Sequence, residues 1–346
     1  MPGGFLLKRL AVFLFLALVV WITLTALLTD VGRVTQLLSR LSLRWLLAIV
    51  GAVLFNYALR FLKWSFFLRL LEIRLSLTDS LWIFFSAFTM ILSPGKVGEL
   101  VKSVLIRSRY GIPAARTAPI VMAERLTDLL GLTALAAIGY SRYSYGGHAL
   151  ELIGGIIAAG TLLITRPRFW ILLDRFFLSR LPRFSRLRGS LLVLQESTAN
   201  LLSLRSLAWT VPLSALSWAG EGFALYFIFQ ALGVDRPDLL GISLFAHAFG
   251  SILGAVSFLP GGLGVTETTM GGFFVLVGFS SELSVSATLL IRALTLWFGV
   301  LLGTIVYLFG RRPGDVLLMP GTPVTPSSAA TSEATSASRV AGDTRD

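Results

Sequence analysis

Cysteine is absent from the 346-residue chain, and histidine occurs only twice, as His148 and His247. Without cysteine the protein can form no disulfide, no cysteine-ligated zinc site and no thiol nucleophile. Two histidines are too few for a histidine-based metal centre. Charge is also scarce, since 14% of the residues are charged, whereas a soluble domain carries about 25%. The sequence therefore predicts neither a metal nor a cofactor, and it disfavours a soluble protein.

Apolar residues take the place of the missing charge. They make up 55% of the chain and give a mean hydropathy of +0.80. Runs long enough to span a bilayer recur along most of the sequence, which is typical of an all-α polytopic membrane protein. Six segments are predicted to cross the membrane, namely Leu10–Leu28, Trp45–Leu62, Ala114–Ile138, Ala149–Thr165, Leu207–Leu232 and Ser284–Phe309. The first resembles a signal peptide, but its apolar run is too long and no small-residue cleavage site follows, so we interpret it as a retained helix.

The net charge of +12 indicates membrane orientation rather than nucleic-acid binding. Lysine and arginine cluster beside the apolar spans, as the positive-inside rule describes for cytoplasmic loops. The largest cluster places seven arginines within residues 166–188. We expect residues 166–205 to form a basic amphipathic cytoplasmic segment on the membrane surface, with a plain cytoplasmic linker as the alternative. Arg60 and Lys63 lie near the end of a span and are interpreted as ordinary positive-inside anchors.

Two further apolar stretches are each interrupted by a Pro-Gly pair. One covers residues 81–109 and the other residues 239–278. If each stretch crossed the membrane once, the seven-arginine loop would lie outside, against the positive-inside rule. If each enters and returns on the same side, every basic cluster and both termini lie in the cytoplasm. We therefore predict two re-entrant helical hairpins that enter from opposite sides, in addition to the six crossings.

These considerations define the domain organisation. Residues 1–312 are predicted to form one transmembrane domain in the cell inner membrane. Residues 313–346 are rich in Pro, Ser, Thr and Ala and are predicted to form a disordered cytoplasmic tail.

The two breaks resemble each other beyond the Pro-Gly pair. Both read P-G-x-x-G, both are followed by a glutamate (Glu99 or Glu267), and both precede an arginine in the next span (Arg125 or Arg292). The proline and the arginine are 31 positions apart in the first stretch and 32 in the second. We interpret residues 81–138 and 239–309 as an inverted repeat. The predicted helix-break residues are Pro94, Gly95, Gly98, Pro260, Gly261, Gly262 and Gly264.

Helix breaks at matching places in two halves are the best sequence indication of a transporter's binding site. A break exposes unpaired backbone N–H groups, whose partial positive charge favours an anion. Ionisable groups inside spans are costly and are therefore candidates for function. The predicted substrate-binding residues are Lys96, Glu99, Glu124, Arg125, Asp128, Glu221, Glu267 and Arg292.

Several of these residues also have a structural interpretation. Arg125 and Asp128 are spaced for a salt bridge within one helix, and with Glu124 they would hold two helices together. Glu221 either faces a cavity or bonds a neighbouring helix. His247 is interpreted as a packed, hydrogen-bonded residue rather than a proton relay.

The residues near the breaks have similar alternatives. Glu99 and Glu267 would cap the broken helices. Lys96 would reach the inner membrane surface. Arg292 has no acidic neighbour at helical spacing, so we expect its partner to be Glu99, Glu267 or a lipid phosphate.

Three motifs carry a family resemblance. The segments S-P-G-K-V-G-E-L, A-E-R-L-T-D and L-P-G-G-L-G-V-T-E resemble the flippase-like transmembrane domain of the lysylphosphatidylglycerol synthase/flippase proteins. The resemblance covers about residues 10–310 and implies movement of a lipid between leaflets. The synthase proteins carry a large aminoacyl-transferase domain after the membrane part. This sequence has a short tail there, so no aminoacylation of lipid is expected.

The leading functional hypothesis is a flippase for a lipid with a charged headgroup, in which Arg125 and Arg292 share an anionic headgroup. The alternatives are a lipid-modifying enzyme that uses Glu124 or Asp128 as a base, and a scaffold for a separate lipid synthase. Because the sequence shows no Ser-His-Asp order, metal-ligand spacing or phosphate loop, we predict that the protein is not an enzyme. The expected partners are membrane lipids, with a lipid-synthesising enzyme as an open alternative. The identity of the lipid and the oligomeric state stay open.

Overall fold

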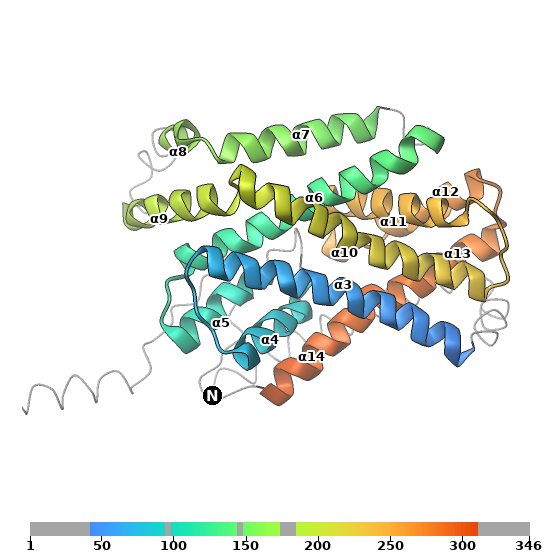
Figure 1. The fold of residues 1–346 in the computed structure, drawn as a ribbon, viewed down its shortest axis with the longest axis horizontal. Coiled ribbons are helices and arrows are strands. Elements are labelled where there is room, and N and C mark those ends of the chain that lie inside the picture. Colours follow the sequence, from blue (N-terminus) through green and yellow to red (C-terminus); the bar gives the residue numbers. More distant parts are fainter. Residues whose placement is uncertain (1–41, 94–97, 144–147, 174–184, 311–346) are drawn as a thin grey trace, which may run out of the picture.

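The structure, a computed structural model, describes residues 42–93, 98–143, 148–173 and 185–310. Every regular element in these ranges is a helix (Figure 1), so the all-α prediction is confirmed. The predictions for Leu10–Leu28, Pro94, Gly95, Lys96 and the tail 313–346 lie outside the described residues.

Long helices correspond to five of the predicted crossings. They are α3 (Leu43–Leu70), α6 (Ala114–Tyr143), α7 (Ala149–Ile164), α10 (Leu204–Ala231), and a continuous unit of α13 (Ser281–Arg292), the π-helical turn η6 (Ala293–Trp297) and α14 (Phe298–Gly310). The 28 residues of α3 and of α10 extend about 42 Å, more than the ~30 Å hydrocarbon core. Three helices among the described residues are long and apolar enough to cross a membrane, namely Leu43–Leu70, Leu239–Val256 and Ser281–Gly310.

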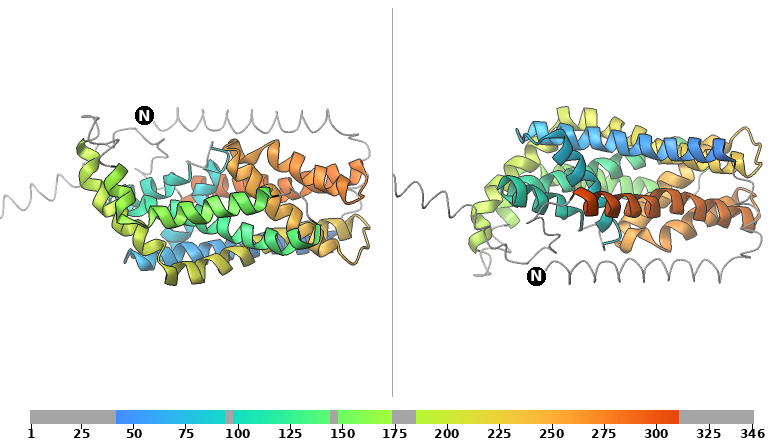
Figure 2. Two further views of the ribbon diagram at one scale, coloured as in Figure 1. Left: turned by 90° about the horizontal axis from the view of Figure 1, so that it is seen from above. Right: turned by 90° about the horizontal axis from the view of Figure 1, so that it is seen from below.

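Both Pro-Gly stretches fold as helical hairpins. In the first, α4 (Leu77–Ser86) continues as η1 (Ala87–Met90), and α5 (Val101–Tyr110) packs back on both. In the second, α11 (Leu239–Val256) is followed by η5 (Pro260–Gly262) and by α12 (Val265–Leu276), which packs back on α11. Figures 1 and 2 show the two hairpins toward opposite ends of the long helices.

The arms of the hairpins differ in length. The 10 residues of α5 extend about 15 Å and the 12 residues of α12 about 18 Å, which is too short to cross a ~30 Å core. The 18 residues of α11 extend about 27 Å, so the first arm of the second hairpin nearly matches the core thickness. The longest of these arms is therefore α11, in the second hairpin.

Glycine conformation produces the second break. Gly261, Gly262 and Gly264 have φ of 60°, 66° and 85°, a region that glycine adopts without steric cost. A Cβ on Gly261 would lie 2.7 Å from Cδ2 of Leu92, which directly precedes the first break. Leu92 also packs with Leu296. Leu92, two positions before Pro94, therefore contacts the second break.

Helix α10 organises the bundle, since it packs on α3, α6 and α11. Small residues permit this close approach: a Cβ on Gly131 of α6 would lie 2.7 Å from the backbone nitrogen of Ala215 in α10. Within the predicted basic segment 166–205 the structure describes α8 (Pro167–Leu173) and α9 (Ser185–Leu201), and α9 packs on α6.

The described helices are apolar outside and charged inside. Large apolar side chains that are more than half exposed include Leu47, Ile138, Leu152, Ile156, Leu216 and Leu301. Lys63, Lys102 and Glu124 are each at most 2% exposed. A soluble protein almost never buries such charges fully, and a contiguous apolar exterior suits a lipid environment.

Candidate functional site

A cavity of about 340 Å³ lies where the two break regions face helices α3, α6 and α10. The predicted residues that line it are Glu99, Arg125, Asp128, Glu221, Gly261, Gly262 and Arg292. They come from both halves of the proposed repeat and from α10 between them. The structure thus brings most of the described candidates to one site.

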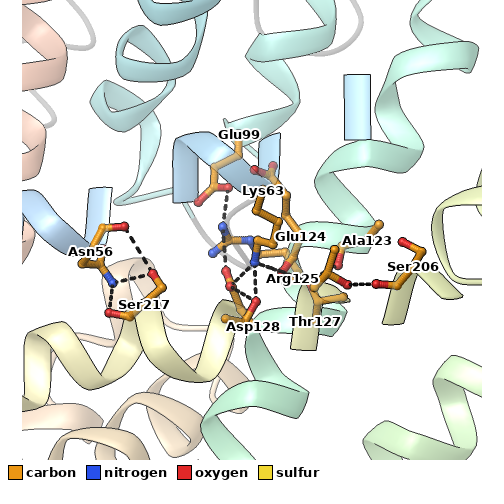
Figure 3. Close-up of polar contacts among 12 residues, drawn as sticks. Asn56, Lys63, Glu99, Ala123, Glu124, Arg125, Thr127, Asp128, Ser206 and Ser217 are labelled. Atoms are coloured by element: carbon orange, nitrogen blue, oxygen red, sulfur yellow. Dashed lines mark hydrogen bonds and ion pairs between the residues drawn. The ribbon is translucent and has the colours of Figure 1, made fainter. Parts of the chain in front are cut away.

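Arg125 forms the centre of the first-half charge cluster (Figure 3). Its Nη2 lies 3.1 Å from Oε2 of Glu99 and 3.2 Å from Oδ2 of Asp128. The second contact is the predicted salt bridge within α6. The first joins the segment after the break to the long helix that follows it.

Lys63 of α3 completes this cluster from the opposite side. Its ammonium bonds Oδ1 of Asp128 and lies 2.7 Å from Oγ of Ser214 and 3.3 Å from Oγ1 of Thr127. The side chain is enclosed by α6 and α10, and the residue is 1% exposed. The prediction that Lys63 is a membrane-surface anchor is therefore wrong, because neighbouring helices surround it on every side.

Glu124 has a separate partner and does not line the cavity. Nζ of Lys102, on α5, donates to its Oε2 at 2.7 Å. The same ammonium lies 4.9 Å from the ring centroid of Trp64 and 5.1 Å from that of Phe84. Glu124 therefore ties the second arm of the first hairpin to α6.

Arg292 makes the corresponding connection in the second half. Its Nε donates to Oε1 of Glu267 at 2.6 Å, and its Nη2 donates to the carbonyl of Gly261 at 2.6 Å. Glu267 also accepts from the backbone N–H of Gly264 at 2.7 Å. Glu267 is thus both the cap expected for α12 and the partner expected for Arg292. It does not line the cavity itself.

Glu221 and His247 form a third polar element of the cavity. Oε2 of Glu221, on α10, lies 3.1 Å from Nε2 of His247, on α11. The ring of Trp218, one turn before Glu221, lies 6.1 Å from the His247 ring. Glu221 therefore faces the cavity and also contacts a neighbouring helix, so both of the alternatives predicted for this residue are observed.

Arg60 also lines the cavity, which the sequence did not predict. It is 7% exposed, and its guanidinium carbon lies 5.3 Å from the ring centroid of Phe88 and 5.8 Å from that of Trp218. The interpretation as a surface anchor is wrong for this residue too, because α3 continues to Leu70 and carries Arg60 into the bundle.

A signal for these missed residues is present in the sequence of α3. Its buried residues are Ile49, Val53, Asn56, Tyr57, Arg60, Lys63, Trp64, Phe67 and Leu68. They recur at intervals of three and four and so mark one helix face. Arg60 and Lys63 lie on this face, whose other members are apolar or aromatic except Asn56, and this position indicates that both side chains point into the bundle.

The π-helical turn after Arg292 is also tied to the cavity. Tyr57 of α3 donates from its hydroxyl to the carbonyl of Thr295 at 3.0 Å, and both residues line the cavity. A π-turn displaces backbone carbonyls from the regular ladder, and such turns are frequent at functional sites. In the described part of the chain, no group of three or more His, Asp and Glu side chains is placed to hold a metal ion.

The arrangement can accommodate a charged group inside a membrane. Buried charges are costly unless they are paired, and Arg125, Arg292, Lys63 and Lys102 each have a carboxylate partner. The pairs of Arg125 and Arg292 fix side chains that line the cavity. The charged lining then supplies hydrogen-bond donors and acceptors to a ligand. The hydrocarbon of a bilayer offers no such partners.

A helical fold with an apolar exterior and a charged internal cavity defines an integral membrane protein. The chain belongs to the family described as "Lysylphosphatidylglycerol synthase TM region", whose model matches residues 9–303. This confirms the resemblance carried by the three motifs.

Several relatives are named UPF0104 membrane proteins. A UPF0104 membrane protein of Pyrococcus horikoshii is 26% identical over 329 residues, which cover 86% of this chain and 97% of the relative. A UPF0104 membrane protein of Methanocaldococcus jannaschii is 25% identical over 228 residues, or 65% of this chain and 95% of the relative. One from Methanothermobacter thermautotrophicus is 34% identical over 122 residues, or 35% of this chain and 36% of the relative. No solved structure matches the chain.

Proposed function

We propose that the protein moves a lipid with a charged headgroup between the two leaflets of the membrane. The observation that carries this proposal is the cavity, which combines buried charged groups with an opening onto an apolar outer surface. The headgroup would occupy the cavity while the acyl tails stay in the surrounding lipid. The protein itself carries out no covalent chemistry in this proposal.

The opening lies at the end of α11. Val256, Phe258 and Leu259 line the cavity, yet they are 43%, 71% and 45% exposed. The cavity therefore reaches the outside between large apolar side chains, which is the surface that acyl tails prefer. Phe258 has φ of 56°, a conformation that is costly for a non-glycine residue and tends to occur at functional sites.

The two hairpins support alternating access. We infer that they are re-entrant, that they form an inverted repeat, and that the matched pairs Glu99–Arg125 and Glu267–Arg292 hold their break regions on either side of the cavity. In transporters with inverted repeats, rocking of one repeat against the other exposes a fixed site to each side in turn.

The geometry favours transport over the enzymatic alternative. A lipid-modifying enzyme would need Glu124 or Asp128 as a free base. Instead each of these carboxylates bonds a buried lysine, Lys102 or Lys63. A scaffold for a separate synthase has no need of a charged internal cavity.

The orientation forms part of the proposal. We infer an inner-membrane location with both termini in the cytoplasm, because this arrangement places every arginine-rich connection on the cytoplasmic side. The membrane lipids are then the protein's direct partners.

A reconstitution experiment tests the function. The purified protein is inserted in liposomes that contain fluorescent lipids with anionic, zwitterionic or uncharged headgroups, and a membrane-impermeant quencher reports the outer-leaflet fraction over time. The proposal expects faster exchange than in protein-free liposomes, with a preference for charged headgroups. Exchange no faster than in protein-free liposomes for every headgroup would refute it.

A further inference from the structure

Arg60 differs from the other buried cations of the described residues. Lys63, Lys102, Arg125 and Arg292 each lie beside a carboxylate. Arg60 is equally enclosed, at 7% exposure, but no described carboxylate is within ion-pairing distance of it. Its guanidinium lies beside the rings of Phe88 and Trp218, and its charge also acts on Asp128 from beyond ion-pairing distance.

An unpaired guanidinium is an expensive group to bury. The two aromatic rings offset part of this cost through cation–π attraction, and no described residue accepts a hydrogen bond from the N–H edges of the guanidinium. Arginine keeps its positive charge at any working pH. Because Arg60 lines the cavity, these donors are available to a ligand there.

We propose that Arg60 binds the phosphodiester group of the transported lipid, an assignment that rests on the proposed function and specifies its substrate class. The planar guanidinium can donate two parallel hydrogen bonds to two oxygens of one phosphate. Arg125 and Arg292 then hold the walls of the site rather than the ligand, since Glu99 and Glu267 already occupy them.

The charge of the cavity favours a singly charged ligand. The lining carries three arginines, Arg60, Arg125 and Arg292, and three carboxylates, Glu99, Asp128 and Glu221. An anionic ligand therefore adds negative charge to a balanced site, and one added charge costs less than two. A phosphodiester carries one negative charge, whereas a free phosphomonoester carries about −1.5 to −2 at pH 7.

The size of the cavity favours a phosphodiester over a fatty-acid carboxylate. At about 340 Å³ the cavity has room beyond the group that contacts Arg60. Glu221 and His247 also line the cavity, where they can bond a hydroxyl or amine of the headgroup beyond the phosphate. A fatty acid has no group to place there.

Native mass spectrometry of the detergent-solubilised protein tests the assignment without measuring transport. The probes are phosphatidylglycerol, diacylglycerol, oleate, and the soluble diester glycerophosphoglycerol. Wild type is compared with Arg60→Gln, with Arg60→Lys, and with Arg69→Gln, which makes the same change at an exposed position of the same helix.

We expect Arg60→Gln to weaken phosphatidylglycerol binding about ten- to a hundred-fold, the effect of losing a hydrogen bond to a charged group. Arg60→Lys should recover part of the affinity, because an ammonium keeps the positive charge but cannot donate the two parallel hydrogen bonds of a guanidinium. Arg69→Gln should bind as wild type does. Diacylglycerol and oleate should bind weakly in all four proteins.

Three results would overturn the assignment. The first is equal phosphatidylglycerol binding by wild type and Arg60→Gln. The second is oleate binding as tight as that of phosphatidylglycerol. The third is unfolding of lipid-free Arg60→Gln at a lower temperature than wild type, which would make Arg60 a structural residue. Equally tight binding of glycerophosphoglycerol would support the phosphodiester site but identify a soluble ligand as its source. Arg60-dependent lipid binding without leaflet exchange would contradict the proposed function alone.

Discussion

Arg292 reaches across the second helix break and bonds Glu267 through Nε at 2.6 Å, while its Nη2 bonds the carbonyl of Gly261 at 2.6 Å. One side chain thus joins the long helix α13 to both sides of the break. Arg125 and Glu99 have the same relationship in the first half, at 3.1 Å. The matched order of break, glutamate and arginine in the sequence corresponds to two ion pairs in the structure.

Removal of Arg292 should destabilise the protein. Arg292→Gln leaves Glu267 without its ion-pair partner, at a cost of about 3 kcal/mol for a largely buried pair. Thermal unfolding in detergent measures this loss. Arg236→Gln is the matched control, because it breaks a more exposed pair with Asp238, which is expected to contribute about 0–1 kcal/mol. Equal effects in the two variants would contradict the bridging role.

Lys63 and Asp128 should show strong coupling. Lys63→Met leaves Asp128 with Arg125 as its remaining ion-pair partner among the described residues and should cost about 3–5 kcal/mol. The double variant Lys63→Met/Asp128→Asn should recover part of that loss, because the carboxylate charge is removed together with its partner. A double-mutant cycle on unfolding free energies gives the coupling. Strictly additive losses would show that the two side chains do not interact.

The glycine requirement of the second break is also testable. Gly262 has φ of 66°, and a Cβ there would lie 2.9 Å from the Cα of Gly254. Gly262→Ala should therefore cost about 1–3 kcal/mol in backbone strain. Gly51→Ala is the control, since no atom lies within 4 Å of its added Cβ and alanine favours a helix interior by roughly 0.5–1 kcal/mol. Unfolding temperatures that shift equally in both variants would contradict this reading of the break.

Single cysteines can map the topology, because the chain has none of its own. Cysteine at Tyr110 or Gly189 should react with an impermeant reagent only from the cytoplasm. Cysteine at Ser144 or Pro237 should react only from outside. Labelling of intact cells and of inverted vesicles distinguishes the two sides. Reaction at Gly189 from the outside would refute the re-entrant hairpins.

The helices and the second break could be predicted from the sequence because they depend on local features. Apolar length predicted α3, α6, α7 and α10, and Pro260 with its following glycines predicted the second break. The spacing of Glu267 and Arg292 was also visible. These features need no knowledge of which helix packs on which.

The inward charges could not be assigned in the same way. The positive-inside rule counts Arg60 and Lys63 as loop-proximal charges, and only the packing of α6 and α10 on α3 shows that they are enclosed. The partner of Glu124 is Lys102, which lies on a different helix. Pairing between helices depends on tertiary contacts that spacing along one helix does not contain.

Blocking the cavity is the most direct test of lipid movement through it. Ser251 of α11 lines the cavity, and Ser251→Trp would fill part of it without changing a charge. Leu216→Trp is the control, because Leu216 is 52% exposed on the outer surface of α10. In liposomes with a fluorescent anionic phospholipid, we predict leaflet exchange at the wild-type rate for Leu216→Trp and at least ten-fold slower exchange for Ser251→Trp, a change of about 1.4 kcal/mol in the barrier. Exchange by Ser251→Trp at the wild-type rate, at matched protein amounts, would contradict passage through this cavity.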